Sequence, residues 1–351
     1  MSLPIGYPKN ELGSTVKYKT LLFSAALIYS SKDRLEVRIT ENFIICFNAV
    51  FPIFAIMAVG CVCRLRGLIG EKEVEKMNKL AFTVFLPVTL FHDIYNSELS
   101  AALRPRLVLF AAVGIPVLAL LSVAVTLLLV KNKNKQGVMI QALFRSNFAI
   151  IGVPLAGALM NGGDISAVAV LLAIVVPINN VLSVVLLAMF NGKKAEPRQV
   201  LLGVVKNPLI IGCVLGLLFT GLKIKLPVPV ESTVSSMAKV GSPLMMFLLG
   251  AFFQFSSLGR QKWELVLASA GRLLIIPAVF LGVAYGLGFK GVEMAALIAV
   301  FASPAAVSSF TMAQQMGGDS ELAGDIVVAT SALCPFTIFF WCMLLKILGA
   351  L

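Results

Sequence analysis

Long apolar runs separated by short polar stretches fill the chain from about residue 42 to its end. Each run is close to the roughly 20 residues that a helix needs to cross the hydrocarbon layer of a bilayer. The pattern predicts helices, numbered 1 to 10 in chain order, over residues 42–63, 79–95, 107–130, 138–160, 165–191, 199–221, 233–255, 265–289, 293–315 and 324–349. We therefore expect an all-α integral membrane protein with ten transmembrane helices.

The composition agrees with this reading and argues against an enzyme. Apolar residues make up 59% of the 351 residues and charged residues 13%, whereas about a quarter of a soluble domain is charged. All six cysteines fall inside the predicted spans and His92 is the single histidine, so we expect neither disulfides nor a metal site. The sequence contains no phosphate-binding loop and no nucleophile elbow, and we expect no cofactor.

The net charge of +12 follows the topology and does not indicate a nucleic-acid partner. Most lysines and arginines between spans follow the odd-numbered helices, while the loops after the even-numbered ones hold only Arg104, Arg106, Lys223, Lys225 and Lys290. The positive-inside rule then predicts a multi-pass protein of the plasma or cytoplasmic membrane with both termini outside. Six basic residues within the first forty oppose that orientation.

Ten prolines, one in each predicted span, divide the chain into two similar halves. Residues 1–40 form an amino-terminal extension, either surface-lying or disordered, because Leu21 to Tyr29 is too short to span. Repeat 1 then covers residues 41–191, a short cytoplasmic linker covers 192–198, and repeat 2 covers 199–351. The prolines are Pro52, Pro87, Pro116, Pro154 and Pro177 in the first repeat, and Pro208, Pro243, Pro277, Pro304 and Pro335 in the second.

An odd number of helices per repeat makes the second repeat enter the membrane from the opposite side. The inverted plan is typical of secondary transporters. The alternative is that one proline per helix is incidental, because proline is frequent in membrane helices.

Helices 4 and 9 carry polar and helix-breaking residues in the middle of apolar spans. Helix 4 contains Ser146 and Asn147 before Gly152 and Pro154, and we expect it to break near Gly152 to Pro154. Helix 9 repeats the pattern over residues 302–309. Breaks inside a membrane are tolerated where the freed backbone groups line a cavity or meet another helix.

Exposed half-helix amino-terminal ends attract a carboxylate through free N–H groups and the helix dipole. No arginine is required for this. The candidate substrate-binding residues are Asn147, Gly152, Pro154, Asn180, Ser303, Pro304, Ser308 and Ser309. The alternative for each polar side chain is an ordinary hydrogen bond between helices.

Acidic residues are missing from the middle third of every predicted span, so a coupling ion has few candidate carriers. Asp93 and Asp325 are the candidates to carry a coupling proton or sodium ion. The alternative for each is that it simply lies at the membrane–water interface. Arg272 is expected to extend toward lipid headgroups. Gly212 with Gly216, and Gly282 with Gly286, have the spacing of close helix packing.

Several of these stretches resemble the auxin efflux carrier family, which includes plant PIN-formed proteins and bacterial malonate-type carriers. The likeness covers about residues 42–349 and is most specific over 303–310 and 316–323, with further similar stretches at 146–155, 206–208 and 243–251. It implies inverted five-helix repeats whose broken helices 4 and 9 cross at the substrate site. It also implies elevator-type movement and a homodimer formed through helices 1, 2, 6 and 7.

The leading hypothesis is a secondary transporter of small organic anions, working by elevator-type alternating access where helices 4 and 9 cross. The substrate is a carboxylate such as malonate or malate, or an aromatic acid. A sodium-coupled carrier of the bile-acid type and a membrane solute sensor that does not transport are the alternatives.

Overall fold

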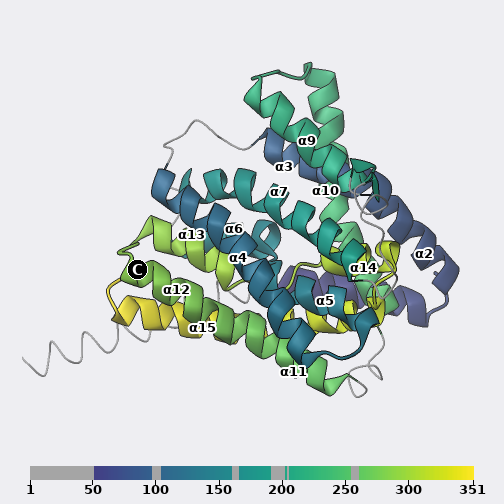
Figure 1. Ribbon diagram of the computed structural model, residues 1–351. Coiled ribbons are helices and arrows are strands. Elements are labelled where there is room, and N and C mark those ends of the chain that lie inside the picture. Colours follow the sequence, from purple (N-terminus) through teal and green to yellow (C-terminus); the bar gives the residue numbers. More distant parts are fainter. Residues whose placement is uncertain (1–50, 97–103, 160–165, 191–201, 204, 254–260) are drawn as a thin grey trace, which may run out of the picture. The chain divides into compact units, whose positions relative to one another are not determined.

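The computed structural model describes residues 51–96, 104–159, 166–190, 202–203, 205–253 and 261–351. These residues form helices joined by short connections (Figure 1). The predicted all-α class is confirmed over this part of the chain. The extension 1–40 and the linker 192–198 lie outside the described residues.

In chain order the helices are the segment Phe51–Leu65, α2 Glu71–Leu80, the π-helical turn η1 Ala81–Phe85, α3 Leu86–Tyr95, α4 Pro105–Leu129, α5 Lys133–Phe144, η2 Phe148–Gly152, α6 Val153–Leu159, α7 Ser166–Met189, α9 Pro208–Gly221, α10 Val228–Phe252, α11 Lys262–Ala270, η4 Gly271–Ile275, α12 Ile276–Gly286, α13 Val292–Phe301, α14 Ser308–Met316 and α15 Ser320–Ile347.

Five helices in the described part of the chain are long and apolar enough to cross a membrane. They are Pro105–Leu129, Val170–Met189, Val228–Phe252, Lys262–Gly286 and Ser320–Ile347. Shorter apolar helices lie in four of the other predicted spans, at Phe51–Leu65, Phe148–Gly157, Pro208–Gly221 and Val292–Phe301. The count of ten membrane-spanning helices and the inverted repeat therefore stay predictions.

The predicted span 79–95 is the second half of a longer helical stretch. The helical stretch begins at Glu71, the first residue of α2. Helix α2 is polar on most of its faces and buries only Val74 and Asn78. Apolar periodicity could not place that start. The Asn78 amide nitrogen donates to the Gln314 amide oxygen, which joins α2 to α14.

The outward faces of the long helices are apolar. On α4, Leu109, Leu120 and Leu128 are 64%, 70% and 80% exposed. Val279 and Val283 are similarly open on α12. Soluble proteins seldom expose so much contiguous apolar surface, and hydrocarbon is the solvent that suits it.

Three prolines stand directly after π-helical turns instead of breaking their helices. The turns η1, η2 and η4 each end two residues before a proline, at Pro87, Pro154 and Pro277. Proline lacks an N–H and its ring crowds the carbonyl four residues earlier. A wider π-helical turn removes both conflicts, because it shifts the carbonyls away from the usual i to i−4 pairing.

Helix α9 packs closely on α3 through two glycines. A Cβ atom at Gly212 would lie 2.5 Å from the Pro87 carbonyl oxygen, and one at Gly216 would lie 2.9 Å from the Ile94 Cβ. This pair has the predicted packing role. The second pair was wrongly assigned, because a Cβ at Gly282 or Gly286 meets no atom within 4 Å.

The most deeply buried helices are two short ones, α5 and α13. Every residue of α13 from Met294 to Phe301 is buried, as is the second half of α5 from Gly137 to Phe144. Helix α13 packs against α6, α7 and α12, and α5 packs against α4, α7 and α15. Both short helices end in the interior, at the polar residues that the sequence singled out.

Candidate functional site

The spans 138–160 and 293–315 are both interrupted in the interior of the protein. Helix α5 ends at Phe144 and η2 begins at Phe148, while α13 ends at Phe301 and α14 begins at Ser308. The two irregular segments pair with each other through an isolated antiparallel bridge between Ser146 and Ala305. Within this bridge the backbone N–H of Asn147 donates to the Pro304 carbonyl oxygen at 2.8 Å.

The first interruption lies earlier than the sequence predicted. We expected a break at Gly152 to Pro154, but the extended residues are Arg145 to Asn147, and Pro154 is the second residue of α6. The π-helical turn η2 accommodates the proline, and the bridge to the second segment supplies partners for the extended backbone. Gly152 serves close packing, because a Cβ there would lie 2.6 Å from the Ala299 carbonyl oxygen.

Arg272 bonds to the carboxyl-terminal ends of both interrupted helices. The predicted orientation toward lipid headgroups was wrong, since this side chain is completely buried. Its guanidinium donates to the carbonyl oxygens of Leu143 at 3.1 Å and Phe144 at 3.4 Å, at the end of α5. It also donates to those of Val300 at 3.0 Å and Ser303 at 2.8 Å, at the end of α13. A cation at two helix carboxyl-terminal ends satisfies their carbonyls and compensates their dipoles.

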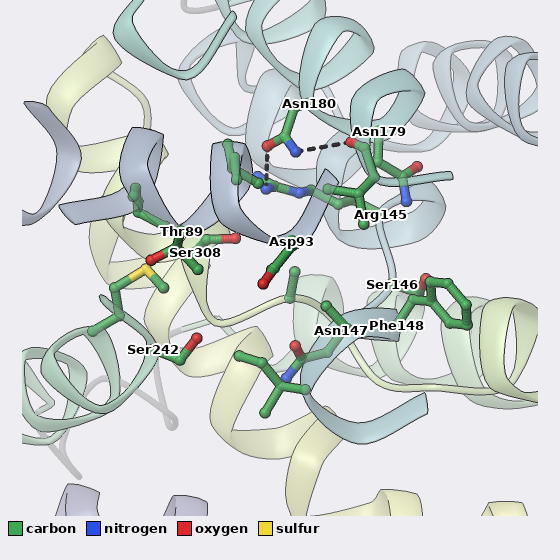
Figure 2. Close-up of a pocket in the computed structure, with 17 residues that line it drawn as sticks. Thr89, Asp93, Arg145, Ser146, Asn147, Phe148, Asn179, Asn180, Ser242 and Ser308 are labelled. Carbon is green, nitrogen blue, oxygen red and sulfur yellow. Dashed lines mark hydrogen bonds between the residues drawn. The ribbon is translucent and has the colours of Figure 1, made fainter. Parts of the chain in front are cut away.

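A small cavity of about 70 Å³, with several polar side chains in its wall, adjoins the first interruption (Figure 2). Five helical elements and both interrupted segments contribute to its wall. Polar lining side chains are Thr89 and Asp93 from α3, Arg145, Ser146 and Asn147 from the first interruption, Asn179 and Asn180 from α7, Ser242 from α10, and Ser308 from α14. The residues that begin η2 and α14 also line it, so two helix amino-terminal ends adjoin the cavity, an arrangement that favours an anion.

Arg145 is the cationic side chain of this cavity. It is 5% exposed, donates from Nη2 to the Asn180 Oδ1 at 2.7 Å, and contacts the Met312 sulfur. Among the described residues, no carboxylate forms an ion pair with it. Sequence reasoning passed over this residue because helix dipoles alone were thought sufficient. The signal was present, since a charged residue within an apolar span is a functional candidate by default.

Two amide groups in the cavity wall have unused hydrogen-bonding capacity. Among the described residues, the Asn147 Nδ2 donor and the Asn179 Oδ1 acceptor have no hydrogen-bond partner, and the two residues are only 4% and 5% exposed. A buried amide without a partner is costly. A polar ligand in the cavity would supply partners to both groups.

The other predicted site residues divide into two groups. Asn147, Asn180, Ser308 and the coupling candidate Asp93 line the cavity. Gly152, Ser303, Pro304, Ser309 and Asp325 lie outside its lining, and the side chain of Pro154 is outside the described part of the chain. Of these, the Ser303 hydroxyl donates to the Ala299 carbonyl at 2.6 Å, and Asp325 is buried within α15.

Known proteins with similar sequences are membrane transporters. The family model described as "Membrane transport protein" matches residues 45–342. An uncharacterized transporter of Methanothermobacter thermautotrophicus is 22% identical over 308 residues, which is 85% of this chain and 98% of that protein. The uncharacterized transporter MJ1031 of Methanocaldococcus jannaschii is 20% identical over 305 residues, 84% of this chain and 97% of that protein. The match confirms the resemblance read from the sequence: the chain belongs to the membrane transport protein family, the family of the auxin efflux carriers.

Proposed function

We propose that this protein is a secondary transporter of small organic anions, and that a substrate carboxylate binds Arg145 in the cavity beside the first interruption. A buried cation without an ionic partner is costly in a protein interior. The Asn180 amide oxygen and a thioether sulfur offset only a small part of that cost. An anionic ligand would complete the site.

The rest of the cavity supports a carboxylate in particular. Arginine binds a carboxylate through two parallel hydrogen bonds, and the Asn147 Nδ2 offers a further donor. Two helix amino-terminal ends add positive potential from the backbone. Arg145 carries the proposal, because it is a buried cation of the cavity wall that forms no ion pair among the described residues.

Transport, as distinct from binding, is proposed to follow an elevator-type mechanism with two inverted five-helix repeats. The paired interruptions are where helices 4 and 9 would cross, and the hydrogen bond from Asn147 to Pro304 joins them. The cavity lies between these segments on one side and α3 and α10 on the other. In this scheme the interrupted helices move against α3 and α10, and the cavity opens to each side in turn.

The test is uptake of radiolabelled carboxylates by the full-length protein in liposomes. Wild-type protein should accumulate at least one small carboxylate, and Arg145→Gln should abolish its uptake. Arg66→Gln is the matched control, because Arg66 is exposed and is not one of the residues that line the cavity. Equal uptake by wild type and Arg145→Gln would refute the assignment of this residue. Repeating the assay with and without sodium separates a sodium-coupled carrier from the other mechanisms, and binding without uptake would indicate a sensor.

A further inference from the structure

The cavity holds a second charged group, of the opposite sign to Arg145. Asp93 stands on the face of α3 that also presents Leu86, Thr89 and Leu90 to the cavity, at helical spacing. Figure 2 shows its carboxyl group directed into the space between Arg145 and Asn147. A ligand bound by Arg145 therefore has a carboxylate near its other end.

Asp93 keeps its capacity to accept hydrogen bonds from a ligand. Its neighbour His92 has its Nδ1 atom 3.6 Å from Oδ1 of Asp93, beyond hydrogen-bonding distance. The side chain is 30% exposed. A hydroxyl, amide or ammonium group of a ligand would find an acceptor there, whereas a second carboxylate would meet a like charge in a partly desolvated site.

The cavity is also small. One water molecule needs roughly 10–15 Å³ by this measure, so a volume of about 70 Å³ holds roughly five water-sized groups. That is the size of a two- or three-carbon acid.

We infer that the site selects a small monocarboxylate that carries a hydrogen-bond donor at its far end, and that Asp93 excludes dicarboxylates. This inference rests on the proposed function and narrows it. Arg145 binds the ligand carboxylate, Asn147 donates a further hydrogen bond, and Asp93 accepts from the ligand hydroxyl, amide or ammonium. Malonate and malate, two of the candidate substrates suggested by the sequence, are then poor ligands.

Two pairs of matched ligands test the selection on purified full-length protein. Malonate and malonamate have the same number of heavy atoms and differ in charge at one end. Glycolate and propionate differ in a donor at that end. Wild-type protein should bind malonamate at least about tenfold more tightly than malonate, and glycolate more tightly than propionate. Glycine, assayed beside glycolate, distinguishes an ammonium donor from a hydroxyl donor.

Substitution of Asp93 should remove both preferences. Asp93→Asn, with Asp93→Ala as a second variant, should bind malonate about as tightly as malonamate. Glu75→Gln, which neutralises an exposed acid on α2, should keep the wild-type ratio. The inference is overturned if wild-type protein binds malonate as tightly as malonamate, or if the ratio survives in both Asp93 variants. Failure of the proposed function has a different signature, in which wild type binds none of these acids or Arg145→Gln binds them equally well.

Discussion

Arg272→Met should lower both the stability of the protein and its affinity for carboxylates, because it removes a side chain that bonds to both interruptions. The guanidinium joins the end of α5 to the end of α13 through four carbonyl oxygens. Arg145 follows directly after one of those carbonyls, that of Phe144. Loss of the bonds should therefore let the two helix ends separate and should displace the cation of the binding cavity.

The size of the effect follows from the bond lengths. Three of the bonds measure 2.8–3.1 Å, and the fourth, to Phe144, is weaker at 3.4 Å. Hydrogen bonds between membrane helices contribute about 0.6–1.7 kcal/mol each, so their loss costs about 2–6 kcal/mol. Burying methionine carries no desolvation penalty of a charge, and this offsets part of that cost. We therefore expect a net loss of about 2–4 kcal/mol in the free energy of unfolding. At about 2–4 °C per kcal/mol, the unfolding temperature should fall by roughly 4–16 °C.

Scanning fluorimetry of the detergent-purified protein measures this shift, and carboxylate binding is measured on the same samples. Arg272→Lys should be no more stable than Arg272→Met. A single ammonium nitrogen cannot reach carbonyls on two helix ends, yet its charge stays buried. Arg66→Met, at an exposed arginine, should leave the unfolding temperature unchanged. Wild-type stability and binding in Arg272→Met would refute the reasoning, and so would full rescue by lysine.

Three further changes probe helix packing, the second interruption and the cavity. Gly216→Leu should lower the unfolding temperature because a Cβ there already crowds α3, whereas Gly282→Leu, which meets open space, should not. Pro304→Ala lets α13 continue toward α14 and should reduce uptake in liposomes several-fold more than Pro116→Ala within α4; equal losses would contradict this role. Asn180→Ala removes the amide acceptor of the cavity guanidinium and should weaken carboxylate binding by about tenfold, and an unchanged dissociation constant would count against that contact.

The sequence predicted where the helices lie but not how two of them bend. Length and hydropathy locate α4, α7, α10 and α15 within a few residues, because burial in lipid requires a continuous apolar run. The start of α2 was missed, since that helix buries few residues. The position of the first interruption was also wrong, because a π-helical turn near Pro154 relieves a conflict that proline usually resolves by breaking the helix.

Candidate site residues were predictable as far as residue type determines their role. Asn147, Asn180 and Ser308 were proposed because polar residues in an apolar span need a partner, and all three line the cavity. The role of Arg272 was beyond the sequence, since a basic residue near the end of a span fits headgroup contact equally well. Only the packing of η4 against α5 brings it to the carbonyls.

Arg145 and Arg272 are both buried, yet their surroundings predict opposite consequences of removal. The Arg272 guanidinium donates to four backbone carbonyl oxygens, which gain hydrogen-bond partners in return, so the group stabilises the fold. Arg145 has one amide oxygen and a sulfur, and its burial therefore costs stability in the protein without ligand.

Arg145→Met should consequently raise the unfolding temperature of the ligand-free protein, or leave it unchanged, while eliminating carboxylate binding. Residues kept for function are often a net cost to the fold, and replacing such a group with an apolar one of similar size relieves it. The measurement is the same unfolding scan with and without carboxylate. Wild-type protein should be stabilised by the ligand and the variant should not. A large drop in the stability of the ligand-free variant would mean that Arg145 stabilises the interrupted helices, as Arg272 does. The main argument that the cavity binds an anion would then fail.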